Sequence, residues 1–358
     1  MNQIRRIAPV LVAGALIFCQ PLFAAESLTL NPPAARAHVV SAHNPLATVA
    51  FKPTPEIVDG MVNQAITNFT GKLTVASAWA SLVGTNETIG IKVFTAPGSS
   101  TGTRPSVAAA VIKGLLEAGV PTNHIILWDR HEADLRRAGY FELAERFGVR
   151  VEGAAEAGYD AKTFYEAAMI GNLVYGDLEF GKKDEGVGRK SFVSKLVSQQ
   201  MTKIINIAPV LNHNGAGVAG NLFSLALSSV DNTVRFEVSP GRLATAVPEI
   251  YALPALGERV VLNISDALIC QYEGEVRGLL HYSVALNEIR FSRDPVALDV
   301  LALQDLDLRR SSNSPGDPAA NRELYKNAAL LELGVADTKH IDITTLKPVP
   351  AQGPADTR

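Results

Sequence analysis

Cysteine is scarce in this sequence, which holds only two among its 358 residues, Cys19 and Cys270. The absence of a C-x-x-C pair and of any four-cysteine cluster excludes a cysteine-ligated iron–sulfur cluster. If Cys19 leaves with an N-terminal leader, Cys270 has no partner for an internal disulfide, and the chain must fold without one. Cys270 stands in an apolar run, so we interpret it as a buried core residue, with a reactive nucleophile as the alternative.

A surplus of either charge is also absent, since 33 Lys and Arg face 36 Asp and Glu, for a formal net charge of −3. Nucleic-acid binders normally use a basic surface for long-range attraction to phosphates, so we expect no nucleic-acid partner. Hydrophobic residues make up 47% of the chain and charged residues 19%, which excludes a disordered, collagen-like or coiled-coil protein.

Motifs of several enzyme classes are missing as well. The seven histidines show no H-E-x-x-H or other metal-ligand spacing. The sequence has no G-x-S-x-G nucleophile elbow, no P-loop and no internal repeat. It therefore assigns no metal ion and no cofactor, and it leaves the substrate and the oligomeric state open.

The first 25 residues are predicted to be a secretory signal peptide. Arg5-Arg6 precedes an apolar run over 7–23, and Ala24-Ala25 supplies small residues for cleavage. A membrane anchor is disfavoured because a spanning helix needs about 20 apolar residues, and two prolines and a glutamine interrupt this run. We expect Sec export to the periplasm, cleavage after Ala24 or Ala25, and no membrane association afterwards; twin-arginine export is the alternative route.

Hydrophobic periodicity then predicts strands and helices in alternation. Strands are expected over 89–93, 124–128, 149–151, 203–211, 259–264 (ending at 265–266) and 287–291. Helices are expected over 55–68, 105–118, 135–147, 221–229 and 295–309, the last with Asp294 as its N-cap. The other segments are expected to be an extended lead-in (26–54), a surface excursion (176–192), a loop with short helical turns (239–259) and a disordered tail (347–358).

This alternation predicts a three-layer α/β fold, with a mostly parallel or mixed sheet and flanking helices. The fold is expected to span residues 55–346 as one large domain, in a single body or in two lobes.

A glycine-rich segment, Gly215-Ala-Gly217-Val-Ala-Gly220, matches the G-x-G-x-x-G dinucleotide fingerprint. A second strand over 233–238 would bring Glu237 near a ribose. Two features disfavour a nucleotide: Asn212-His213-Asn214 separates the strand from the first glycine, and the motif stands late in the chain. A loop that binds an anion through backbone N–H groups, with Asn214, Gly215 and Gly217 at the ligand, is preferred.

Polar residues follow several predicted strands, and ligands of open α/β sheets bind at the carboxyl ends of strands. We predict His213 as general acid or base, with Asp129 and Asp266 as catalytic partners that orient groups or bind metal. Each of these residues has a structural alternative, as a loop histidine bonded to backbone or as a turn or cap aspartate. The predicted ligand-binding residues are Lys92, Arg130, Arg189, Lys190 and Asp299, of which the last must find a partner or accept a raised pKa inside its apolar helix.

Several motifs, in this order, resemble the bacterial domain-of-unknown-function family 362. They are Ile-Gly-Ile-Lys-Val (89–93), Ile-Leu-Trp-Asp-Arg (126–130), Leu-Arg-Arg-Ala-Gly-Tyr (135–140), Gly-Arg-Lys-Ser (188–191), Ile-Ile-Asn-Ile-Ala-Pro-Val-Leu (204–211), Leu-Asn-Ile-Ser-Asp-Ala-Leu (262–268), Asp-Pro-Val-Ala-Leu-Asp (294–299) and Leu-Gly-Val-Ala-Asp (333–337). The resemblance covers roughly residues 55–345.

The family has no established reaction, and some of its members carry a ferredoxin-type iron–sulfur module that this chain lacks. Many members have Lys-x-His and then a glycine-rich helix start with Leu-Lys-Asn. Here the matching stretches are Asn212-His213-Asn214 and Asn221-Leu-Phe-Ser224, so the histidine is kept and both lysines are missing. The resemblance therefore leaves two hypotheses: an exported enzyme acting on a small anionic molecule, or a non-catalytic exported binding or accessory protein with a degenerate site.

Overall fold

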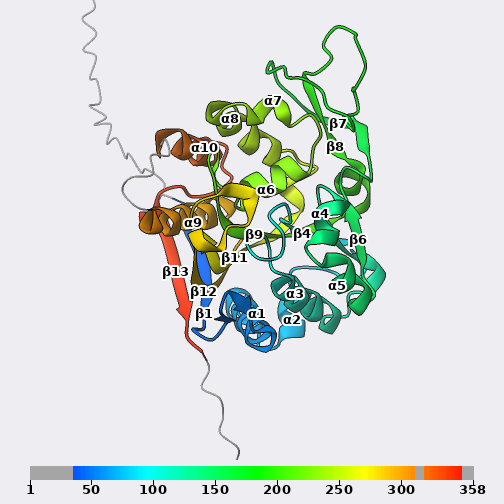
Figure 1. Cartoon of the computed structure of the whole chain (residues 1–358). Coiled ribbons are helices and arrows are strands. Elements are labelled where there is room, and N and C mark those ends of the chain that lie inside the picture. Colours follow the sequence, from blue (N-terminus) through cyan, green and yellow to red (C-terminus); the bar gives the residue numbers. More distant parts are fainter. Residues whose placement is uncertain (1–34, 311–317, 349–358) are drawn as a thin grey trace, which may run out of the picture. The chain divides into compact units, whose positions relative to one another are not determined.

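The computed structural model describes residues 35–310 and 318–348, which belong to one unit (Figure 1). The predicted signal peptide and residues 349–358 of the predicted tail lie outside these ranges. No helix within them is both long and apolar enough to cross a membrane.

A nine-stranded sheet forms the centre of the fold. Strand β12 is antiparallel to both of its neighbours, every other pair along the main path is parallel, and β10 (Gly217–Val218) pairs antiparallel with β9. From edge to edge the path is β13 (Ile341–Leu346), β1 (Ala37–His43), β12 (Ser283–Ser292), β11 (Val260–Gln271), β9 (Lys203–His213), β4 (Ile89–Val93), β5 (Ile125–Asp129) and β6 (Arg150–Gly153).

Helices cover both faces of this sheet because the central strands are apolar on both faces. In β5, Ile125 and Leu127 join one apolar cluster, and Ile126 and Trp128 join the other. The first cluster lies under α1 (Pro55–Thr70), α2 (Val75–Ala80), α3 (Pro105–Glu117), α4 (Glu132–Arg137) and α5 (Tyr140–Phe147). The second lies under α6 (Asn221–Ser228), α7 (Val234–Glu237), α8 (Pro240–Tyr251), α9 (Pro295–Arg309) and α10 (Pro318–Leu330). The predicted three-layer α/β fold is confirmed (Figure 1).

The order of the strands reverses between β4 and β9. From β4 the chain passes to β5 and β6 on one side, whereas β9 and β11 add on the other side. In open α/β sheets, such a switch point is where the connections at the carboxyl ends of strands diverge and leave a crevice. Helix α3 follows β4 directly, so its N-terminus lies at this edge of the sheet.

Three local predictions were wrong. The helix predicted over 135–147 is two helices, because Gly139 adopts a φ of 83° between α4 and α5. The candidate strand over 233–238 contains the short helix α7, and the predicted loop over 239–259 contains the 12-residue helix α8. Ser239 is the N-cap residue of α8, and its hydroxyl accepts the backbone N–H of Arg242.

The lead-in and the surface excursion also contain regular structure. Within the predicted lead-in, β1 lies inside the sheet, between β12 and β13, and β2 (Thr48–Val49) pairs with β3 (Lys52–Pro53). Strands β7 (Tyr159–Glu166) and β8 (Lys190–Ser194) form a hairpin, and the predicted excursion covers the second part of the connection between them and the start of β8.

Candidate functional site

The glycine-rich segment is a β-hairpin. Strand β9 continues through Asn212 and His213, and Gly217-Val218 pairs back onto these two residues. A side chain at Gly215 would lie 2.7 Å from Leu243, and Gly217 has a φ of 87°, so packing and turn geometry account for both glycines. The dinucleotide arrangement, in which a strand runs into the first glycine, is not formed.

Lys92 and Asp129 form a buried ion pair, with 2.9 Å between Nζ and Oδ1. The Asp129 carboxylate also accepts hydrogen bonds from the backbone N–H and hydroxyl of Thr95 and from the hydroxyl of Ser228. Burial on its own would raise the pKa of Asp129, but the charge of Lys92 and these hydrogen bonds bring it below its usual value. The pair therefore ties β4 and β5 to α6.

Asp266 lies within β11, which continues to Gln271, so the predicted strand end at 265–266 was wrong. Its carboxylate pairs with the buried Arg104 guanidinium, 3.0 Å from Nη1 to Oδ1, and accepts the Arg104 backbone N–H at 2.7 Å. Arg104 is the N-cap residue of α3. Asp266 thus fixes the position at which α3 begins.

Asp299 is buried in α9 and faces the first turn of α6. It accepts the backbone N–H groups of Asn221 (2.6 Å) and Leu222 (2.9 Å) and the Asn221 side-chain amide. Burial raises the pKa of Asp299 to about 7 despite these hydrogen bonds. The partner that an acid in this apolar helix requires is therefore the N-terminus of α6.

A buried row of polar side chains lies beneath α6, and only its Lys92 was predicted as a site residue from the sequence. Lys92, Asn206 and Asn263 occupy neighbouring positions across β4, β9 and β11. The Asn206 side-chain amide donates to Asn263 Oδ1 at 3.1 Å and to the Asn221 carbonyl at 2.9 Å. The sequence did contain a signal for this row, because each of the apolar runs 204–211 and 260–264 includes one asparagine, and a buried asparagine needs hydrogen-bond partners.

His213 lies half-buried at the end of β9. Its Nδ1 accepts the backbone N–H of Ala216 at 3.0 Å, and its ring centroid lies 4.2 Å from that of Phe223. Burial lowers the pKa of His213, against the opposing charges of Glu275 and Glu237. The neighbouring Asn214 is exposed, and its backbone N–H donates to Glu275.

The predicted cationic residues lie beside α7 and the β7–β8 hairpin. Arg130 donates to the Thr233 hydroxyl at 2.7 Å, Arg189 is exposed, and the Lys190 ammonium lies 4.1 Å from the centroid of the Phe164 ring.

The predicted aspartates do not share partners. Asp129, Asp266 and Asp299 bond to Lys92, Arg104 and Asn221 respectively. Across residues 35–310 and 318–348, no group of three or more His, Cys, Asp or Glu side chains could hold a metal ion.

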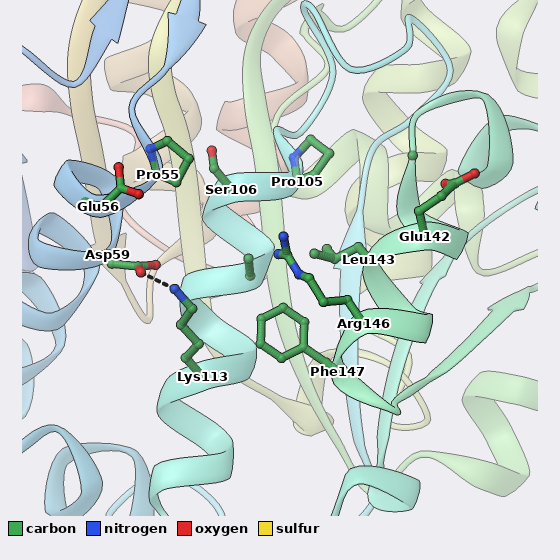
Figure 2. Close-up of a pocket in the computed structure, with 12 residues that line it drawn as sticks. Pro55, Glu56, Asp59, Pro105, Ser106, Lys113, Glu142, Leu143, Arg146 and Phe147 are labelled. Atoms are coloured by element: carbon green, nitrogen blue, oxygen red, sulfur yellow. Dashed lines mark hydrogen bonds and ion pairs between the residues drawn. The ribbon is translucent and has the colours of Figure 1, made fainter.

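A pocket of about 780 Å³ opens between α1, α3 and α5 (Figure 2). None of the residues predicted for the site lines it. Its walls include the first turns of two helices and one face of a third, with Pro55 and Glu56 on α1, Pro105 and Ser106 on α3, and Arg146 and Phe147 on α5.

One cation in this pocket is left without a polar partner. Lys113 is ion-paired with Asp59. Arg146 lies 4.8 Å from the centroid of the Phe147 ring, and it makes no hydrogen bond or ion pair with another described residue, although Glu142 lies one turn earlier on the same helix. Figure 2 shows Arg146 extending from α5 toward α3, with Pro105 above its guanidinium.

The start of α3 presents open hydrogen-bond donors to the same pocket. Pro105 occupies the first turn, no side chain caps the helix, and the backbone N–H groups of Val107 and Ala108 bond to the Arg104 carbonyl. The N–H of Ser106 is left open, and the Ser106 hydroxyl is buried without a hydrogen-bond partner among the described residues. An uncapped helix N-terminus beside a guanidinium is suited to bind an anion.

Comparisons with known proteins add little to this geometry. No protein-family model matches the sequence, and no curated protein matches it. A crystal structure of a protein from Thermotoga maritima, from the Northeast Structural Genomics Consortium, is similar with a TM-score of 0.39 and 12% identity. The match covers 72% of this chain and 59% of that one, so this chain spans less than two thirds of the other protein's length.

Proposed function

We propose that this protein binds a small anionic molecule in the pocket between α1, α3 and α5 and performs no chemistry on it. The observation that carries the proposal is that unpaired Arg146 extends toward the uncapped start of α3, where the Ser106 hydroxyl also lacks a partner. The pocket volume of about 780 Å³ lies within the range of roughly 300–1,000 Å³ usual for small-molecule sites.

The state of the buried aspartates favours binding over catalysis. Asp129, Asp266 and Asp299 are each at most 3% exposed and bonded to groups of the protein itself. A general acid or base must come within hydrogen-bond reach of its substrate. These carboxylates serve to hold β4, α3 and α6 in place.

Arg146→Gln tests the proposal, with Arg136→Gln as the matched control. Arg136 stacks on Phe141, 3.7 Å from the ring centroid, and does not line the pocket. Thermal shift and calorimetry with inorganic phosphate and a series of small carboxylates would identify a binding anion. Arg146→Gln should weaken that anion about tenfold or more, since a charge-assisted hydrogen bond contributes about 1.5–3 kcal/mol. Equal affinity in the two variants, or no anion bound by the wild type, would refute the proposal.

The enzyme hypothesis is the second candidate, and His213 carries it. Because the His213 Nδ1 accepts a backbone N–H, a neutral ring has its proton on Nε2 and could act as a donor there. His213→Ala should abolish turnover or ligand response with little change in thermal stability. A stability loss of about 2 kcal/mol or more would instead assign His213 a structural role.

We also propose that the chain is exported and related to family 362. The charged, apolar and small-residue pattern of residues 1–25 and the eight motifs quoted above support this. Cell fractionation with intact-mass measurement tests export, and a periplasmic chain should begin at Ala25 or Glu26. Superposition on an experimental structure of a family member should place those motifs on the same strands and helices.

A further inference from the structure

We infer that Asn214 is a site of spontaneous covalent modification, assisted by the side chain of Asn212. In this modification the Asn214 side chain closes onto the backbone nitrogen of Gly215 and is converted to aspartate and isoaspartate. The site lies at the turn between β9 and β10 and does not line the pocket between α1, α3 and α5. The inference is therefore independent of the proposed anion binding.

The nucleophile of this reaction is the backbone nitrogen of Gly215. Asn214-Gly215 is the one asparagine–glycine pair in the sequence. The nitrogen must approach the side-chain carbonyl carbon of the asparagine, and glycine has no Cβ to obstruct that approach. Among the described residues the Gly215 N–H has no hydrogen-bond partner. No hydrogen bond with the protein must therefore break before this N–H loses its proton.

A buried side chain holds the carbonyl group that is attacked. Asn212 is 3% exposed, and its Oδ1 accepts the backbone N–H of Glu275 at 2.9 Å. Because that oxygen is occupied, its Nδ2 is the atom that faces Asn214, where it donates to Oδ1 at 3.2 Å. The Asn214 oxygen becomes negatively charged during the attack, and a donor fixed in place stabilises that charge.

The amide nitrogen of Asn214 is the leaving group. Asn214 is exposed, and this nitrogen forms no hydrogen bond with another described residue. The attack forms a bond from the Gly215 nitrogen to Asn214 Cγ and breaks the bond from Cγ to Nδ2. Ammonia departs with the proton of the Gly215 amide. Water then opens the cyclic imide at either carbonyl, which gives aspartate or isoaspartate.

The product changes the charge beside His213, the candidate acid or base. The Asn214 backbone N–H donates to Glu275 at 2.9 Å, so a new carboxylate on residue 214 is repelled by the charge of Glu275. Isoaspartate also adds a methylene to the backbone of the turn, whose Ala216 N–H donates to His213. Both changes weaken the contacts that hold His213 and the turn.

Peptide mapping of the folded protein during incubation in mildly alkaline buffer tests the inference. Mass spectrometry locates the modified residue, and an isoaspartyl methyltransferase assay detects the isoaspartate product. Asn214 should be converted first. Asn172, which is also exposed but is followed by leucine, should remain unmodified over the same period.

Two variants test the assistance by Asn212. Asn212→Asp keeps an acceptor for the Glu275 N–H but removes the donor to Asn214, and Asn212→Ala removes the donor without adding a charge. Both should slow the conversion of Asn214 about tenfold, the effect of losing one hydrogen bond to a developing charge. Equal rates in the wild type and both variants would overturn the role of Asn212.

The same incubation of the wild type in urea separates the effect of the fold from that of the Asn-Gly pair, and it depends on no variant. Conversion in the folded protein should be at least as fast as in the unfolded chain. If Asn214 persists in the folded protein while the unfolded chain is converted, the turn protects Asn214 and the inference is wrong.

Discussion

At the scale of single residues, the buried polar side chains of this protein hold neighbouring strands, loops and helices together. Each of the predicted site aspartates accepts at least one backbone N–H, from Thr95, Arg104 or Asn221. A buried backbone N–H without an acceptor destabilises the folded protein. An acid that accepts such an N–H at a loop or at the start of a helix therefore stabilises the fold. Polar residues after buried strands were therefore good signals for buried contacts.

Asp299 should make the free energy of unfolding depend on pH. Its pKa is about 7 in the folded protein, against the ordinary value of 3.8. Stability from this group is fully present below pH 3.8 and is lost as the pH rises through 7. At 1.36 kcal/mol for each pKa unit, the wild type should lose about 3 kcal/mol from this group between pH 5 and pH 8.

Urea unfolding of the wild type and Asp299→Asn at both pH values measures this effect. The variant mimics the neutral acid, so its stability should change less between pH 5 and pH 8. An identical change in both proteins would mean that Asp299 does not titrate in this range.

The Lys92–Asp129 pair should show strong coupling in a double-mutant cycle. Lys92→Met leaves the Asp129 carboxylate buried without its cation, which costs about 3–5 kcal/mol. Asp129→Asn in the same chain removes the stranded charge while keeping an acceptor for Thr95. In chemical denaturation, the stability lost by the double variant should therefore be smaller than the sum of the losses in the two single variants, by about 1 kcal/mol or more. Additive losses would mean that the two charges do not interact.

At the scale of helices and strands, hydrophobic periodicity was sufficient where an element is buried on both sides. The strands at 89–93 and 203–211 and the helix from Pro105 were predicted within a few residues of their bounds. Prediction failed where tertiary contacts decide, as in α8, which packs on α6 and α10. It also failed at Gly139, whose left-handed backbone conformation ends α4 and precedes α5.

The β7–β8 connection shows how one side chain can hold a long segment. Arg235 is fully buried and donates to the carbonyl oxygens of Tyr165, Met169 and Arg189. Arg235→Ala should release this segment, so that trypsin cleaves after Lys182 or Lys183 at least tenfold faster than in a Lys52→Ala control. Mass spectrometry of the first fragments to form identifies the cleavage site. Cleavage throughout the chain would instead indicate global unfolding, and an unchanged rate would refute the anchoring role.

At the scale of the whole molecule, the pocket depends on contacts that no local pattern encodes. Its walls come from residues near positions 55, 105 and 146, and they meet because α1, α3 and α5 cover the same face of the sheet. Pro105 at a helix start was visible in the sequence. The approach of Arg146 to that start was not, because it depends on how α3 and α5 pack.

Cys270 offers a probe of how cooperatively this molecule unfolds. It is fully buried in β11, and burial raises the pKa of its thiol to about 12. A thiol reagent needs an exposed thiolate, so labelling requires β11, which is bonded to both β9 and β12, to leave the sheet. In a chain that starts at Glu26, Cys270 is the sole cysteine. Labelling across a urea series should therefore follow the same midpoint as loss of circular dichroism. Labelling well below that midpoint would show that β11 opens as a separate unit while the rest of the sheet persists.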